Sequence, residues 1–161
     1  QIDDPVLRRG AQPHLGFLQR ELKLVDQEIA HQLQQRPELA ALRSLRGAGP
    51  VLQATLACEL PELGRLDGKA VAKLVGVAPL ARDSGQWRGR RVIWGGRAGI
   101  RTALYMSALT AMRYEPALRD FYLRLRERGK AAKVAIVAVM RKMLVILNAR
   151  MRDHLRSIQP T

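Results

Sequence analysis

One cysteine and three histidines are the only thiol and imidazole groups in this chain of 161 residues. A single cysteine, Cys58, excludes an intramolecular disulfide and a cysteine-based zinc cluster. His14, His31 and His154 are scattered and lack the spacing of metal ligands. We therefore predict no metal site in this chain, and within the sequence LACEL we expect Cys58 to be a small buried hydrophobic residue.

The chain also lacks a signal peptide and an apolar run long enough to span a membrane. Its most apolar stretch, VAIVAVMRKMLVILNA (134–149), is interrupted by Arg141 and Lys142 and predicts a buried helix with one polar edge. We expect a cytoplasmic protein with no membrane partner. Because the sequence begins at Gln1 and not at a methionine, we interpret it as a fragment of a longer protein.

Acidic residues are scarce, with 14 Asp and Glu against 28 Lys and Arg and a formal net charge of +14. A chain this basic usually binds a polyanion, with nucleic acid as the first candidate and an anionic membrane surface as the second. The membrane alternative is disfavoured because the basic residues cluster on loops and not opposite an apolar helix face. Nucleic acid is therefore the expected partner.

No acidic residue occurs between Ser84 and Tyr114. A solvated face normally mixes both signs of charge, so an unbalanced block on a glycine-rich loop predicts phosphate contacts. The arginines expected to make these contacts are Arg82, Arg88, Arg90, Arg91, Arg97 and Arg101. Trp87 and Trp94 either stack on a base or sugar or anchor the loop in the core, and RRVIW (90–94) predicts a short strand.

The hydrophobic pattern elsewhere is that of a mainly α-helical fold. A helix is expected from Pro13 to about Gln35, and its apolar residues recur every three or four positions. These residues are Leu15, Leu18, Leu22, Val25 and Ile29. The pattern fits either a helix packed on its own domain or a dimerising coiled coil. Further helices are expected at about 69–75, from 97 up to Pro116, and at 117–128 and 130–155.

The sequence Gly47-Ala48-Gly49 lies between two expected short helices, with Pro50 at the start of the second. A glycine-x-glycine turn of this kind is the pattern of a helix-hairpin-helix, in which backbone N–H groups bind a nucleic-acid phosphate without reading bases. Gly47 and Gly49 are therefore candidate binding residues. A tight turn without a ligand is the alternative.

Ser84 lies between an aspartate and a glycine in this basic loop. A serine hydroxyl needs activation to act as a nucleophile, and the sequence offers neither a nearby histidine nor a G-x-S-x-G elbow. Attack on a phosphodiester is one interpretation, since arginines and metal ions stabilise the charge in such reactions. From the residues alone, an ordinary turn in RDSG is the favoured interpretation.

The sequence LVGVAPLARDSGQWRGRRVIWGGRAGIRTALYMSAL (74–109) resembles the signature of the carboxy-terminal transposase domain of the insertion-sequence transposases grouped as the 116/110/902 family, relatives of Piv-type DNA invertases. The resemblance covers roughly 42–152. It implies a bridge-RNA-guided DNA recombinase in which Ser84 is the nucleophile. It also implies an amino-terminal RuvC-like domain whose DEDD carboxylates bind Mg²⁺, joined to this domain by a coiled-coil linker.

The departure from the family pattern is the missing half, because Asp3 and Asp4 lie outside any such carboxylate motif. We expect a linker helix (1–40), a transposase domain with the serine motif (41–156) and a frayed tail (157–161). The implied partners are DNA, a structured guide RNA and further copies of the chain, as a homodimer or higher oligomer. The fragment alone is expected to be inactive, since the family's active site joins the serine of one subunit to the acidic site of another. A non-catalytic nucleic-acid-binding module is the alternative function.

Overall fold

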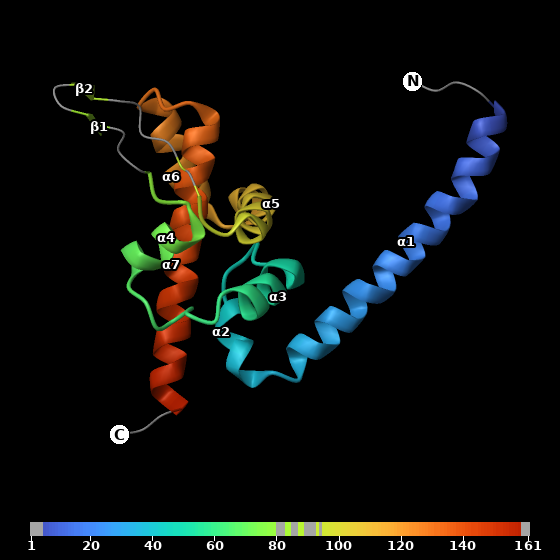
Figure 1. Ribbon diagram of the computed structural model, residues 1–161, viewed down its shortest axis with the longest axis horizontal. Coiled ribbons are helices and arrows are strands. Elements are labelled where there is room, and N and C mark those ends of the chain that lie inside the picture. The colour runs from blue at the N-terminus through green and yellow to red at the C-terminus, as the bar shows by residue number, and fades with distance from the viewer. Residues whose placement is uncertain (1–4, 80–82, 85–86, 89–92, 94, 159–161) are drawn as a thin grey trace.

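The computed structural model describes residues 5–79, 83–84, 87–88, 93 and 95–158, and over this part of the chain the fold is mainly α-helical, as predicted (Figure 1). Two strands of two residues each lie in the connection between the fourth and fifth helices. In chain order the elements are α1 (Pro5–Gln34), the 3-10 helix η1 (Pro37–Leu39), α2 (Ala40–Arg43), α3 (Pro50–Glu59), α4 (Gly68–Val75), β1 (Asp83–Ser84), β2 (Trp87–Arg88), α5 (Ala98–Tyr114), α6 (Pro116–Glu127) and α7 (Ala132–Ile158).

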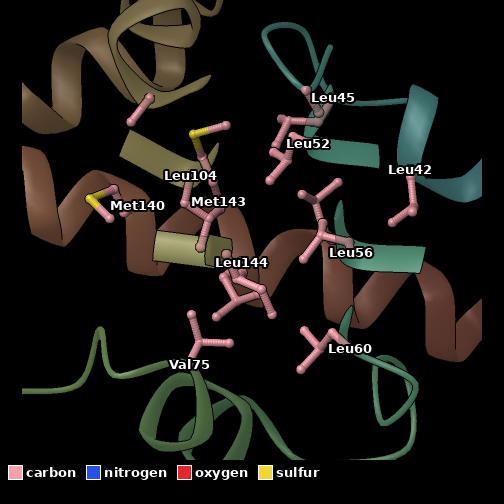
Figure 2. Packing of buried hydrophobic residues seen from close by; sticks show 14 of the residues in the cluster. Leu42, Leu45, Leu52, Leu56, Leu60, Val75, Leu104, Met140, Met143 and Leu144 are labelled. Atoms are coloured by element: carbon pink, nitrogen blue, oxygen red, sulfur yellow. The ribbon is translucent and has the colours of Figure 1, made fainter. Parts of the chain in front are cut away.

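Helix α7 is the centre of the packed body, and α2, α4, α5 and α6 all contact it (Figure 1). Its buried residues recur at helical spacing, from Ala135 through Leu144 to Met151, so one face of the helix enters the core. Figure 2 shows Leu144 among apolar side chains from α3, α4 and α5, including Leu56, Val75 and Leu104. Burying a leucine side chain of this kind stabilises the folded state by roughly 1.5–3 kcal/mol. The predicted buried helix at 134–149 is confirmed, since it lies within α7.

Helix α1 runs away from this body, and only its end packs against it (Figure 1). Ile29 lies against the core, whereas Leu15, Leu18, Leu22 and Val25 are exposed. The apolar seam predicted from the sequence therefore has no partner within the described part of the protomer.

The start predicted for this helix, at Pro13, is wrong. α1 begins at Pro5, in the first turn where proline is tolerated, and continues through Pro13. Proline has no N–H, so the helix loses one backbone hydrogen bond to the carbonyl of Arg9 but is not ended there. The sequence predicts the starts of α3 and α6 better, because Pro50 and Pro116 do begin these helices.

The expected burial of Cys58 is also wrong, because its side chain is exposed. Helix α3 buries Leu52, Gln53 and Leu56. Successive residues of a helix are turned by about 100°, so a residue two positions after Leu56 points well away from the buried face. None of the described helices combines the length and apolar content that a membrane crossing requires.

Helix α4 is fixed at both ends by local signals. At its start, Asp67 Oδ1 accepts hydrogen bonds from the N–H groups of Lys69 and Ala70, each 2.7 Å long. These bonds hold the pKa of the Asp67 carboxyl below its ordinary value. At its end, Gly76 adopts the left-handed conformation with φ 79° and its N–H bonds back into the helix. The chain therefore leaves α4 at a defined point, where the connection that carries Ser84 begins.

Candidate nucleic-acid interface

Ser84 lies in the connection from α4 to α5 (76–97), which we call the serine segment (Figure 1). Within it, β1 pairs with β2 in antiparallel register, with Asp83 opposite Arg88 and Ser84 opposite Trp87. Ser84 therefore lies beside Trp87, on a neighbouring strand that runs in the opposite direction. Arg82, Arg90, Arg91 and Trp94 lie outside the described residues, as does the strand predicted at 90–94 apart from Ile93, so their roles stay predictions.

The two ends of the serine segment meet backbone to backbone. Gly96 has φ 71°, and a Cβ placed on it would lie 2.5 Å from both the nitrogen of Gly76 and the carbonyl carbon of Val75. A Cβ on Gly76 would likewise collide with the carbonyl oxygen of Gly95. Only glycine permits this approach together with a positive φ. We call this crossing, formed by Val75, Gly76, Gly95 and Gly96, the neck.

Arg101 ties the two sides of the neck together from the first turn of α5. Its Nη1 donates to the carbonyl of Val75 at 3.3 Å and to the carbonyl of Gly95. One side chain therefore links the end of α4 to the end of the serine segment. The guanidinium that the sequence predicted to contact phosphate is half-buried and is used within the chain.

Arg97 makes a second tie, to the connection after α3. Its Nη1 and Nη2 donate to the two carboxylate oxygens of Glu62 at 2.8 Å and 2.7 Å, and Nη1 also donates to the carbonyl of Glu59 at 2.6 Å. These side-chain hydrogen bonds lower the pKa of the Glu62 carboxyl to about 2 and raise the pKa of Arg97 above its ordinary value. The proposed phosphate contacts of Arg97 and Arg101 stay predictions, but both side chains already hold the base of the serine segment.

The Gly47-Ala48-Gly49 turn lies between α2 and α3, as expected. Gly47 has φ 93°, and a Cβ on it would come 2.5 Å from Ala111 of α5, so packing alone explains this glycine. Gly49 is different, because it is exposed and a Cβ added to it would meet no atom within 4 Å. Of the two glycines, only Gly49 lies open to a ligand, at the N-terminus of α3, and the helix-hairpin-helix role stays a prediction.

Sequence reasoning missed the acidic partners of this region, Glu59 and Glu62. They lie in the sequence CELPEL, more than thirty positions before Arg97, and no local sequence pattern predicts that they pair with this arginine. A Cβ added to Gly99 would lie only 2.8 Å from a carboxylate oxygen of Glu59, so the start of α5 lies close to the end of α3. Among the described residues, no group of three His, Cys, Asp or Glu side chains is placed to hold a metal ion.

Comparison with known proteins places these features in a family. A model of the "Transposase IS116/IS110/IS902 family" matches residues 39–123, which include the serine segment and the neck. The chain is 33% identical over 146 residues to the "Insertion element IS116 uncharacterized 44.8 kDa protein" of Streptomyces clavuligerus, a match that covers 84% of this chain and 35% of the relative. It is 32% identical over 141 residues to the IS900 protein of Mycobacterium paratuberculosis, covering 85% of this chain and 35% of the relative.

A further relative is the "Pilin gene-inverting protein" of Moraxella lacunata, 34% identical over 90 residues, covering 53% of this chain and 28% of that protein. The chain spans about a third of the length of the insertion-element proteins that it matches.

Proposed function

The chain belongs to the IS116/IS110/IS902 transposase family, and on that premise we propose that it is the part of a DNA recombinase that supplies the nucleophile, Ser84. The observation that carries this proposal is the family match across the serine motif, in a chain whose net charge is +14. A relative that inverts a pilin gene supports a reaction that rearranges DNA. The fold supports it by holding both ends of the serine segment on a rigid helical body.

In the proposed reaction, Ser84 Oγ attacks the phosphorus of a DNA phosphodiester. A bond forms between the serine oxygen and phosphorus, the serine proton goes to a base, and the bond to one deoxyribose oxygen breaks. That oxygen leaves with the electron pair and takes up a proton, so the DNA end is left esterified to the serine. Arginines beside the phosphate stabilise the developing charge. Reversal on a different strand end completes an exchange.

The neck serves this reaction by positioning. A nucleophile gains rate when it is held close to the reacting atom in the right direction. The backbone crossing at Gly76 and Gly96, with the ties from Arg101 and Arg97, limits how far the base of the serine segment can shift. Arg82, Arg88, Arg90 and Arg91 are then the residues that we assign to phosphate.

The Mg²⁺ implied by the resemblance does not fit the described residues, which offer no suitable set of ligands. It would need carboxylates from a RuvC-like domain outside this chain, and no step above runs through it. On the same reasoning, we propose that this chain is inactive by itself. We also propose that a structured guide RNA selects the DNA.

The exposed seam of α1 supports assembly. Leu15, Leu18, Leu22 and Val25 each have about half or more of their surface exposed, and they fall on one helical face. Pairing with the same face of a second copy would bury them. We propose a coiled-coil homodimer, or a higher oligomer, in which the serine of one copy meets the acidic site of another.

The test uses the full-length protein with its RNA, DNA and Mg²⁺. A denaturing gel and mass spectrometry should detect a DNA-linked peptide that contains Ser84, and Ser84→Ala should bind nucleic acid normally but give no covalent product and no strand exchange. Ser157→Ala, at the exposed end of α7, is the matched control and should recombine normally. Full recombination by Ser84→Ala would instead support the alternative, a non-catalytic nucleic-acid-binding module.

A further inference from the structure

A hollow of about 410 Å³ lies between the connection from α3 to α4 and the last turns of α7. Its lining is unusually rich in arginine for its size: Gly64, Arg65, Arg152, Leu155 and Arg156. No carboxylate of the described residues belongs to this lining. The hollow is near the C-terminal end of α7, whereas β1 and β2 lie toward the other end of that helix (Figure 1).

The frame of the hollow is fixed by contacts between the connection at 64–66 and helix α7. Asn148, with 1% of its surface exposed, accepts a hydrogen bond from the N–H of Gly64 at 2.8 Å and donates to the carbonyl of Leu66 at 2.9 Å. A Cβ on Gly64, whose φ is 82°, would lie 2.8 Å from Met151 Cγ. A buried polar side chain and a required glycine thus hold the 64–66 backbone directly on α7.

This frame places three arginine side chains around the same hollow. Arg152 Nη2 donates to the carbonyl of Leu66 at 2.6 Å, which fixes its guanidinium at the edge of the hollow. Arg65 follows Gly64 on the connection, Arg156 lies one helical turn after Arg152, and both are exposed. The carboxylate of Asp67 is close enough to Arg152 for the two charges to attract, but it already accepts the hydrogen bonds that cap α4. The side chain of Asp153 is exposed and does not line the hollow.

The negative end of a helix dipole accounts for only part of this arrangement. It stabilises cations in the last turn of a helix, which suits Arg156 but not Arg152, one turn earlier. The helix dipole does not explain Arg65, which lies on the connection from α3 to α4. Its positive charge is repelled by those of Arg152 and Arg156. Three guanidiniums around one hollow are stabilised best by an anion between them, and arginine pairs with phosphate through two parallel hydrogen bonds.

We propose that Arg65, Arg152 and Arg156 bind a phosphate of a nucleic-acid backbone, as a contact separate from the serine segment. The inference rests on the proposed function in that it takes nucleic acid as the ligand. Val77 and Ile93, near the ends of the serine segment, line a common hollow with Val137 in the first half of α7. From Val137 to Arg152 the helix rises by roughly 20 Å, so a backbone touching both sites spans several nucleotides.

The test measures salt-dependent binding by the full-length protein in a Ser84→Ala background, so that no reaction disturbs the equilibrium. Labelled duplex DNA and a labelled structured RNA are titrated separately over a range of salt concentrations. Arg65→Ala with Arg156→Ala should reduce the slope of log K against log salt by about 0.7–0.9, the value for one phosphate, for at least one of the two ligands. The ligand that responds identifies the source of the phosphate.

The matched control removes the same charge by Arg124→Ala with Arg128→Ala at the end of α6, where both residues are exposed and line neither of the two hollows named above. It should leave the slope unchanged. Arg65→Lys with Arg156→Lys should restore the slope but only part of the affinity, because lysine cannot form the paired hydrogen bonds. Circular dichroism checks that each variant folds.

An unchanged slope for both ligands, or an equal loss in the control, would overturn the proposal. Both results are separate from the test of Ser84, because binding is measured without catalysis. If wild-type protein bound neither DNA nor RNA, the proposed function itself would fail.

Discussion

Gly96 lies against the backbone of Gly76, twenty positions earlier in the chain, so closely that a Cβ on Gly96 would be 2.5 Å from the nitrogen of Gly76. The contact closes the serine segment at its base. Because φ at Gly96 is 71°, a side chain there meets both backbone strain and a collision.

Gly96→Ala should therefore destabilise the protein by more than the same change at its neighbour does. We expect a loss of roughly 1–3 kcal/mol from the free energy of unfolding, the range for a strained backbone position, with the collision adding to it. Gly95→Ala is the matched control, since Gly95 has φ 70° but no atom within 4 Å of an added Cβ. Urea denaturation of the two variants checks this, and equal losses would mean that the crossing contributes nothing.

The Glu62–Arg97 pair should make stability depend on pH in acid. The folded pKa of Glu62 is about 2, below its ordinary value of 4.5, so the pair's stabilisation is complete above about pH 4.5 and is lost as the pH falls toward 2. Glu62→Gln should lower the melting temperature at pH 7 and flatten its fall over that window. The effect should shrink in high salt, since the two side chains are 31% and 36% exposed.

Glu127→Gln, at the exposed end of α6, is the control for the removal of a carboxylate. Melting curves recorded from pH 7 to pH 2 should match wild type in their dependence on pH. A variant at Glu62 that behaved like this control would show that the pair is unimportant for the fold.

Local signals make much of the fold predictable. Asp67 caps α4, Gly76 ends it, and Pro50 and Pro116 begin helices, so each boundary depends on residues beside it in the sequence. Proline is a less reliable signal at position 13, because an exposed helix tolerates the loss of one hydrogen bond.

The site is less predictable because its contacts join distant residues. The basic loop and its serine stand out in the sequence, but Arg97 meets Glu62 across 35 positions, and Arg101 meets Val75 across 26. The predicted burial of Cys58 is wrong for the same reason: which face of α3 enters the core is decided by the helices that pack on it, α5 and α1, and not by the residues around the cysteine.

The apolar seam of α1 predicts a dimer. Leu22 is 62% exposed in the protomer, and pairing with a second α1 would bury it. Leu22→Glu would place an unpaired carboxylate in that interface, at a cost of at least about 1.4 kcal/mol, or a tenfold weaker association. Gln27→Glu adds the same charge on the outer face and should leave association unchanged. Light scattering over a range of concentrations measures both, and a wild-type protein that stayed monomeric at high concentration would contradict the coiled coil.

The arginines around Ser84 should separate into two groups by their effects on binding and on stability. Arg88, Arg90 and Arg91 changed together to alanine should lower the salt slope of nucleic-acid binding by about 0.7–0.9 for each phosphate lost, with no change in unfolding. Arg101→Ala should do the reverse. It removes the donor to the carbonyls of Val75 and Gly95, so we expect a loss of roughly 1–3 kcal/mol from the free energy of unfolding and an unchanged slope.

Arg101→Lys sharpens the comparison, because it keeps the charge but offers a single compact donor group in place of the planar guanidinium. The free energy of unfolding of Arg101→Lys should lie between those of Arg101→Ala and the wild type. If Arg101→Ala instead lowered the slope and left unfolding unchanged, Arg101 would belong with the phosphate-binding arginines, as the charge pattern of the sequence first suggested, and the neck would depend on its glycines alone.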